Sequence, residues 1–245
     1  MKRLAQADGL SWLTLRPIAH RGLHDMAGKD PQKPENSLAA FQAAVENDYA
    51  IECDLQISAD GVPVVFHDDT LDRLTGETGL VRGRTAAELA RVAILHSGET
   101  IPALSDMLEQ VAGAVPLVIE LKSIAGENGG FAQAVADHLR DYSGPVAVMS
   151  FDTDLAAAMM AAAPGLPIGL VAEGGLATTI RHLTAIVRHG FHFVSYCLTD
   201  LPTPAPLIAR WVLGLPLICW TVRTPQDARK ARRWTGQMTF EAIRP

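Results

Sequence analysis

The sequence is poor in cysteine. Its 245 residues include only three, Cys53, Cys197 and Cys219. An odd number without the spacing of a zinc or redox motif argues against a disulfide-stapled secreted fold and against a cysteine-based metal site. Each cysteine lies in an apolar run of the kind that forms a strand. We therefore expect three buried free thiols in a reducing compartment.

Long hydrophobic runs are also missing. A membrane-spanning helix needs about 20 consecutive apolar residues, and the alanine-rich run over residues 155–170 is interrupted by Pro164 and Pro167. The first residues are basic, but Gln6 and Asp8 interrupt the following apolar run before it reaches the length of a signal peptide. The sequence therefore predicts a soluble, cytoplasmic protein with no integral membrane association.

Positive charge is in deficit. Lys and Arg total 21 against 27 Asp and Glu, which gives a formal net charge of -6. Proteins that bind nucleic acid or anionic membranes through general electrostatics need clustered basic residues, so the composition argues against both partners. Any phosphate must then be bound by a local site. A glycine-rich phosphate loop is also absent after the first expected strand, which disfavours an open doubly wound sheet, the alternative fold.

What the sequence does contain is a regular alternation. Short runs rich in valine and isoleucine alternate with longer amphipathic stretches, the pattern of βα units that build a parallel sheet. We predict strands over residues 17–21, 51–55, 117–121, 146–150, 168–171, 193–196, 217–221 and 238–241. The predicted helices cover residues 38–47, 104–112, 131–141, 155–162, 178–189, 206–213 and 225–233. This number of units in a chain of about 250 residues predicts a (β/α)8 TIM barrel, a single α/β domain over residues 1–245.

The segment 69–100 interrupts the alternation. It is rich in turn residues and contains only one short helical pattern, near residues 86–92. We interpret it as an insertion, which either shapes the entrance of a site or forms a solvated loop. Just before it, Asp60-Gly61 separates two apolar runs and predicts a β-hairpin after the second strand.

Two acids stand at alternate positions of the second expected strand. Glu52 and Asp54 point to one side of a strand, while Cys53 and Leu55 point to the other. The hairpin would bring both acids opposite His67. Two carboxylates on one buried face repel each other unless a cation meets them, and their hard oxygens suit Mg²⁺ or Ca²⁺ better than Zn²⁺. The alternative interpretation is an ordinary solvated face.

Polar side chains also stand at the ends of other expected strands. His20 and Arg21 end the first, Glu120 and Lys122 lie at the end of the third, and Trp220 lies near the end of the seventh. Barrel active sites form at the carboxyl ends of the strands, so these residues and the acid pair should converge on one mouth. Together they supply what is needed to hold a phosphate diester and to move protons beside it.

Six short motifs follow one another in a recognisable order. They are His20-Arg21-Gly22, Pro34-Glu35-Asn36-Ser37, Glu52-Cys53-Asp54, Phe66-His67-Asp68, Glu120-Leu121-Lys122 and Trp220-Thr221. In this order the sequence resembles the glycerophosphodiester phosphodiesterase family. The similarity runs from His20 to the C-terminus, and residues 34–75, which include LDRLT, are its most specific part.

The resemblance implies a TIM-barrel hydrolase that cuts glycerophosphodiesters into glycerol 3-phosphate and an alcohol. It implies a divalent cation, Mg²⁺ or Ca²⁺, bound by Glu52, Asp54 and Glu120. It also implies that one of His20 and His67 takes a proton from the neighbouring glycerol hydroxyl, which attacks phosphorus, while the other protonates the leaving alcohol. The residues implied to bind phosphate or substrate are Arg21, Lys122, Glu35 and Trp220; Glu35 would either steady Arg21 or reach the metal.

One departure from the family pattern lies at the end of the closing strand, which reads Thr239-Phe240-Glu241 where a Thr-Asp is common. The change leaves the local acid at Glu241 and puts Phe240 near the pocket or in the core. His24 is a weaker candidate for a substrate-loop residue. A lysophospholipase D-like activity and a non-catalytic phosphodiester-binding protein stay open, although two histidines argue against mere binding. The sequence also leaves open the head group of the small-molecule substrate and the oligomeric state.

Overall fold

The computed structural model describes residues 8–26, 31–124, 126 and 128–245. Its strands form one sheet in the order β1-β9-β8-β7-β6-β5-β4-β2-β3, and pairing of β1 with β2 closes a barrel. The parallel barrel strands are β1 (Ile18–Ala19), β2 (Ala50–Ile57), β4 (Leu117–Leu121), β5 (Val146–Ser150), β6 (Ile168–Ala172), β7 (Phe193–Cys197), β8 (Leu217–Val222) and β9 (Gln237–Phe240). The TIM-barrel prediction is confirmed.

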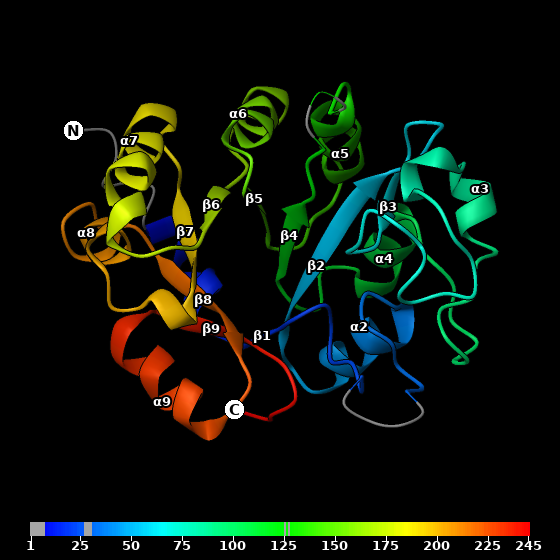
Figure 1. Ribbon diagram of the computed structural model, residues 1–245, viewed down its shortest axis with the longest axis horizontal. Coiled ribbons are helices and arrows are strands. Elements are labelled where there is room, and N and C mark those ends of the chain that lie inside the picture. Colours follow the sequence, from blue (N-terminus) through cyan, green and yellow to red (C-terminus); the bar gives the residue numbers. More distant parts are fainter. Residues whose placement is uncertain (1–7, 27–30, 125, 127) are drawn as a thin grey trace.

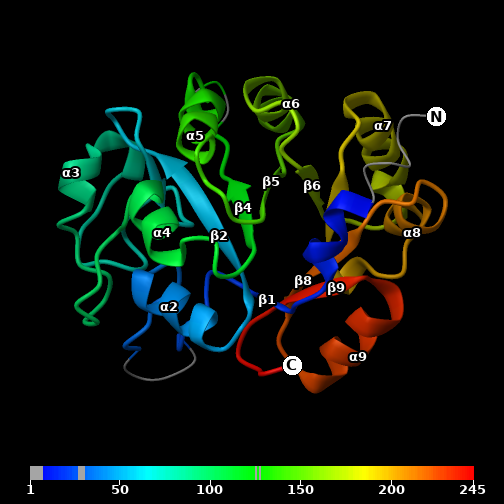
Figure 2. The same ribbon diagram turned by 180° about the vertical axis from the view of Figure 1, so that it is seen from behind.

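Helices surround this barrel on its outside (Figure 1, Figure 2). They are α2 (Leu38–Glu46), α4 (Leu104–Val111), α5 (Phe131–Leu139), α6 (Thr153–Ala162), α7 (Thr179–His189), α8 (Pro204–Trp211) and α9 (Pro225–Trp234). Polar caps begin several of them: the Ser37 hydroxyl accepts from the Ala40 N–H at 3.2 Å at the start of α2, and Asp152 caps α6. Such caps satisfy N–H groups that lack a partner within the helix. The predicted helices are therefore confirmed, with ends that differ by up to two residues.

The interior of the barrel has an apolar floor. Most of its side chains come from the first two residues of the strands, so they fill the amino end of the barrel. The 3₁₀ helix η1 (Asp8–Thr14), which the periodicity did not predict, adds Leu13 to this floor. The buried members are Leu13, Ile18, Ala50, Val118, Ala147, Met149, Val171, Phe193 and Ile218. Polar residues at the other end of the strands therefore stand above an apolar base.

The predicted hairpin is present, because β3 (Pro63–Val65) pairs antiparallel with β2 and places Leu55 opposite Val65. The chain then passes through η2 (Val81–Gly83) and α3 (Ala86–Leu89), seen beside β2 and β3 in Figure 1. This excursion has an apolar cluster of its own, made of Val64, Phe66, Leu71, Leu74, Val81, Leu89, Val92, Ile94 and Ile101. The insertion over residues 69–100 is therefore packed, and its interpretation as a solvated loop is wrong.

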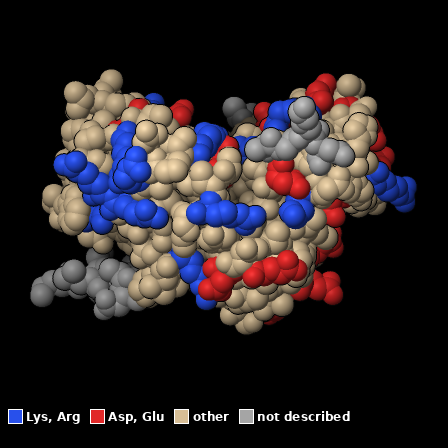
Figure 3. All heavy atoms as spheres, turned by 90° about the horizontal axis from the view of Figure 1, so that it is seen from below, with Lys and Arg blue, Asp and Glu red and all other residues tan. Residues whose placement is uncertain are grey.

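The surface shows mixed charge. On the face drawn in Figure 3, Lys and Arg side chains form a broken band with uncharged residues between them, and Asp and Glu side chains lie close by. This face carries no continuous field of one sign among the described residues. Within the same part of the chain, no helix has both the length and the apolar character needed to cross a membrane.

Candidate active site

A cavity of about 360 Å³ lies at the carboxyl ends of the barrel strands, where the sequence predicted a mouth. All but one of the predicted site residues line it. They are His20, Arg21, Glu52, Asp54, His67, Glu120, Lys122 and Trp220. The exception is Glu35, which lies beside the cavity and contacts Arg21. The convergence of residues from separate strand ends on one site is therefore present in the structure.

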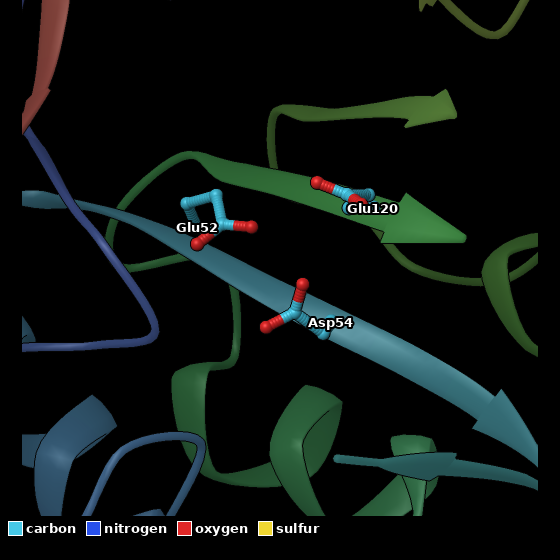
Figure 4. A group of neighbouring side chains, drawn as sticks. All are labelled: Glu52, Asp54 and Glu120. Atoms are coloured by element: carbon cyan, nitrogen blue, oxygen red, sulfur yellow. The ribbon is translucent and has the colours of Figure 1, made fainter. Parts of the chain in front are cut away.

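The base of the cavity carries three carboxylates, shown in Figure 4. Glu52 and Asp54 come from β2, and Glu120 comes from the adjacent β4, where the parallel register puts it opposite Asp54. One oxygen of each carboxylate lies within 4.8 Å of the others, and all three residues are buried. Cys53 and Leu55 of the same strand pack into the core between sheet and helices. The alternation predicted for β2 is confirmed, and the interpretation as a solvated face is wrong.

Two cations neutralise part of this charge. The Lys122 Nζ lies 2.9 Å from Asp54 Oδ1 and 2.5 Å from Glu120 Oε1, and the Arg21 Nε lies 3.3 Å from Asp54 Oδ2. The Asn36 amide donates to the same oxygen at 2.9 Å. Burial alone would raise the pKa of Asp54, but Lys122 and Arg21 hold it below its ordinary value. Asp54 is therefore a carboxylate at neutral pH.

Glu52 and Glu120 are less well balanced. Burial raises the pKa of Glu52 well above its ordinary value, and the negative charges of Asp54 and Glu120 raise it further. Burial also raises the pKa of Glu120 to about 7, although Lys122 opposes the change. The cluster thus holds more negative charge than the neighbouring cations compensate. A hard divalent cation fits this set of oxygen donors and would remove the imbalance.

His20 lies at the end of β1 against a carboxylate from beyond β9. Its Nδ1 is 2.6 Å from Glu241 Oε2, and its Nε2 is 4.0 Å from Glu52 Oε2. Burial lowers the pKa of His20, while the hydrogen bond to Glu241 opposes that fall. The Nε of Arg223 donates to the other oxygen of Glu241, and His24 lies 3.8 Å from the oxygen that faces His20. With Nδ1 engaged, Nε2 is the nitrogen available for proton exchange in the cavity.

His67 follows β3 and has its own acid partner. Its Nδ1 lies 2.6 Å from Oδ1 of Asp68, the next residue. Its side chain is 31% exposed, against 11% for His20. Burial lowers the pKa of His67, and Asp54 acts in the opposite direction. Burial would raise the pKa of Asp68, but hydrogen bonds from Arg73 and His67 bring it down to about 2.

Glu35 is held by two arginines. Its Oε1 accepts from Arg21 Nη1 at 2.5 Å and from Arg73 Nη2 at 2.7 Å. Burial would raise the pKa of Glu35, but the hydrogen bond from Arg73 and the charge of Arg21 lower it below its ordinary value. The acid cluster found among the described residues does not include it. Glu35 was expected either to steady Arg21 or to reach the metal. In the structure it contacts Arg21 and lies outside the acid cluster.

Another wall of the cavity is aromatic. Trp220 packs edge-to-face against Phe151, with 5.6 Å between the ring centroids. Phe240, by contrast, is buried against Tyr49, so it belongs to the core. Cys197 is free and half-buried, and it lines the cavity. The expectation of burial holds for the other two cysteines but is wrong for Cys197, because the last residue of β7 faces the cavity.

The partners of the two histidines were not predicted as site residues. Asp68 lies in one of the six motifs and Glu241 at the end of the closing strand, but neither residue was predicted to have a role, and neither were Arg73 and Arg223. Asp68 could have been found, since an acid directly after a candidate histidine is a local signal. Glu241 could not, because only closure of the barrel brings it to His20.

Comparison with known proteins points to one family. The model of the glycerophosphoryl diester phosphodiesterase family matches residues 20–237. The chain is 32% identical over 232 residues to the glycerophosphodiester phosphodiesterase of Caldanaerobacter subterraneus subsp. tengcongensis, covering 87% of this chain and 88% of that one. It is 39% identical over 77 residues to human glycerophosphodiester phosphodiesterase 1, which is 31% of this chain and 21% of the human one.

Solved structures show the same fold. An Oleispira antarctica phosphodiesterase, whose structure holds the product sn-glycerol-3-phosphate, superposes with a TM-score of 0.81 at 23% identity over 94% of both chains. The glycerophosphodiester phosphodiesterase of Thermotoga maritima superposes with a TM-score of 0.74 at 25% identity, over 91% of this chain and 92% of that one. The similarity therefore includes almost the whole barrel.

Proposed function

This chain belongs to the glycerophosphoryl diester phosphodiesterase family, and on that premise we propose that it hydrolyses glycerophosphodiesters to glycerol 3-phosphate and an alcohol with a bound divalent cation. One observation carries the proposal. Two histidines, each with a carboxylate on Nδ1, face a cavity whose base holds three buried carboxylates. Proton transfer and phosphate binding can therefore take place in the same space.

Glu52, Asp54 and Glu120 would hold the cation. Their oxygens are close enough together to share one ion, and the raised pKa of Glu52 reflects burial and the unbalanced negative charge around it. Mg²⁺ and Ca²⁺ both prefer such oxygen donors. When bound, the ion would polarise the phosphoryl oxygens and offset the charge that develops on them.

Arg21 and Lys122 would bind the phosphate beside that ion. Both side chains are 17% exposed and line the cavity. The planar guanidinium of Arg21 suits two non-bridging oxygens, whereas the Lys122 ammonium supplies a point charge. Trp220 and Phe151, packed edge to face, form an aromatic wall against which the glycerol group or the alcohol could pack.

The histidines would move the protons through Nε2. One ring removes the proton of the glycerol hydroxyl next to the phosphate, and the freed oxygen attacks phosphorus. The other ring donates a proton to the oxygen of the departing alcohol. Water then opens the resulting cyclic phosphate with the proton transfers reversed, which gives glycerol 3-phosphate. The carboxylates on Nδ1 fix each ring's tautomer and orientation for these steps.

A second candidate activity is a lysophospholipase D-like cleavage, in which the substrate carries an acyl chain. The favouring observation is the apolar part of the cavity wall, which contains Met149, Phe151, Leu198 and Trp220. Phe151 is 45% exposed, so this wall extends to the surface. The same reaction chemistry would serve both kinds of substrate. Only an assay with substrates of both kinds therefore distinguishes the two activities.

The direct test is release of product by the purified protein: glycerol 3-phosphate from the two glycerophosphodiesters, and acylglycerol 3-phosphate from lysophosphatidylcholine. Glycerophosphocholine, glycerophosphoethanolamine and lysophosphatidylcholine would be supplied with EDTA and then with excess Mg²⁺ or Ca²⁺. His20→Ala is the test variant, and His189→Ala, a histidine on α7 outside the cavity, is its matched control.

We expect metal-dependent release in the wild type and in His189→Ala, and a rate at least about 100-fold lower in His20→Ala. Release that persists fully in EDTA would contradict the proposed need for a divalent cation, but it would still support the proposed hydrolysis of glycerophosphodiesters. No release from any glycerophosphodiester with any metal would contradict the proposed reaction and favour a protein that only binds phosphodiesters.

A further inference from the structure

Arg73 lies outside the cavity lining, yet its guanidinium is engaged on two sides. Its Nε and Nη2 donate to the two oxygens of Asp68 at 2.6 and 2.9 Å. Its Nη1 and Nη2 donate to the two oxygens of Glu35 at 3.1 and 2.7 Å. The planar fork of an arginine can make two such paired contacts at once, whereas an ammonium cannot.

Each of these carboxylates holds a residue of the cavity. Asp68 lies 2.6 Å from the Nδ1 of His67, and Glu35 lies 2.5 Å from the Nη1 of Arg21. A continuous series of hydrogen bonds therefore runs from one cavity residue to the other through Arg73. Building on the proposed function, we infer that Arg73 is a positioning residue that fixes the proton-transferring His67 and the phosphate-binding Arg21 relative to each other.

The backbone that carries Arg73 is firmly anchored. Leu71 and Leu74 are buried in the apolar cluster of the insertion, with exposures of 0% and 1%. The N–H of Thr75 donates to the Leu71 carbonyl at 3.1 Å, which closes the turn that contains Arg73. The insertion thus acts on the chemistry through one arginine, and its packing supplies the rigidity that such a role needs.

A simple surface ion pair would be the competing explanation, since the Arg73 side chain is 45% exposed and exposed ion pairs contribute little. The Glu35 side chain, however, is only 7% exposed. Without Arg73, this buried carboxylate would depend on Arg21 alone, and Arg21 also serves Asp54 at 3.3 Å. The guanidinium of Arg21 would then be free to follow Glu35 away from the phosphate, and a misplacement of about 1 Å can cost about 100-fold in rate.

The test compares Arg73→Ala and Arg73→Lys with Arg84→Ala. Arg84 is the matched control because it belongs to the same insertion but pairs with Glu77, outside the cavity lining. Values of kcat and KM for glycerophosphocholine would be measured for all three and for the wild type. Each protein is also assayed with guanidinium chloride well below the denaturing range, against sodium chloride at equal concentration, and its melting temperature is recorded.

We expect Arg73→Ala to lose about 100-fold in kcat with a smaller change in KM, and Arg73→Lys to lose about tenfold because it keeps the charge without the fork. Free guanidinium should restore Arg73→Ala several-fold by filling the gap between Asp68 and Glu35, and should leave Arg84→Ala unchanged. If Arg73→Ala does not fold, Arg73→Lys decides: a tenfold loss at an unchanged melting temperature supports the inference.

Three results would overturn it. The first is a kcat of Arg73→Ala within twofold of the kcat of Arg84→Ala. The second is a loss of kcat in Arg73→Ala that added guanidinium does not reduce. The third is wild-type kcat in Arg73→Lys when the alanine variant is unfolded. Inactivity of the wild type itself is a separate outcome, because it removes the proposed function on which the inference rests.

Discussion

The two histidines of the cavity are held in opposite ways. The His20 pair (His20 and Glu241) joins residues 221 positions apart in sequence, at the seam where β1 meets β9. The His67 group (His67, Asp68 and Arg73) is local, since its members lie within seven residues of one another beside the insertion. The first ring is also the more buried, with 11% of its side chain exposed against 31% for the second.

This difference shows how one site can rest on two kinds of structural support. The geometry of the His20 pair depends on closure of the whole barrel. The geometry of the His67 group depends on the small apolar core under the insertion. The three acids of β2 and β4 line the same cavity as both histidines. Damage to the closing strand and damage to the insertion should therefore have separable effects, whereas damage to the acids should not.

The largest expected effect comes from removing the acids that line the cavity with both histidines, because neither histidine can act without the bound cation. Glu52→Gln combined with Asp54→Asn should bring metal-dependent hydrolysis below detection while the barrel stays folded, since both changes preserve shape and remove charge. The matched control is Glu46→Gln with Asp48→Asn, which has the same spacing on an exposed surface. Full turnover by the first double variant, measured as glycerol 3-phosphate release, would contradict the metal cluster.

The next largest effect should separate the two rings by role. His20→Ala and His67→Ala should each lose roughly 10²- to 10⁴-fold in kcat, the usual contribution of one acid or base. A substrate with an activated leaving group, such as a p-nitrophenyl ester of glycerol 3-phosphate, needs no proton from the general acid. Only the variant that lacks this acid should then recover activity. Recovery of activity by both variants, or by neither, would contradict the assignment of one histidine as general acid and the other as general base.

Smaller effects should come from the carboxylate partners. Glu241→Gln and Asp68→Asn should each cost roughly 10- to 100-fold in kcat, because they release the ring that each carboxylate orients. Burial lowers the pKa of His20, and the hydrogen bond that its ring donates to Glu241 is the largest opposing effect. Its loss should lower that pKa further, so the limb of the kcat/KM profile that belongs to His20 should move to lower pH.

The same experiment sharpens the contrast between the two histidines. The largest opposing effect on the pKa of His67 comes from Asp54, which Asp68→Asn leaves in place. The pH profile should therefore move less for Asp68→Asn than for Glu241→Gln. Equal shifts, or a larger shift for Asp68→Asn, would show that the two rings do not differ as the structure describes.

The smallest expected effect belongs to Arg223. Its side chain is 56% exposed and bonds the outer oxygen of Glu241. An exposed ion pair of this kind contributes little, and His20 keeps its bond to the other oxygen. Arg223→Gln should therefore change kcat/KM less than about threefold, with Glu241→Gln as the internal comparison. A loss as large as that of Glu241→Gln would give Arg223 a direct part in the reaction.

Much of this arrangement could be predicted from the sequence because it follows from local rules. Strand alternation placed Glu52 and Asp54 on one face, and βα order placed the strand ends together. The turn at Asp60-Gly61 predicted the hairpin that brings His67 to the cavity. These features depend on spacings within a few residues or on the order of elements, and both can be inferred from one sequence.

The rest depended on tertiary closure, which spacing does not encode. Glu241 meets His20 only because β9 pairs with β1. The insertion has an apolar cluster that draws on scattered positions without a helical or strand period, so its packing could not be predicted. Cys197 was expected to be buried because its run is apolar, yet the side chain of the strand's last residue faces the cavity.

The most direct measurement of the central claim is a ³¹P NMR time course of glycerophosphocholine with the wild-type protein and bound Mg²⁺ or Ca²⁺, beside the same substrate methylated on its 2-hydroxyl. If the two histidines act on opposite sides of one phosphate, the intact substrate should pass through a cyclic phosphate to glycerol 3-phosphate, and the methylated substrate should stay uncleaved. Cleavage of both substrates at the same rate would contradict attack by the neighbouring hydroxyl and, with it, the roles given to His20 and His67.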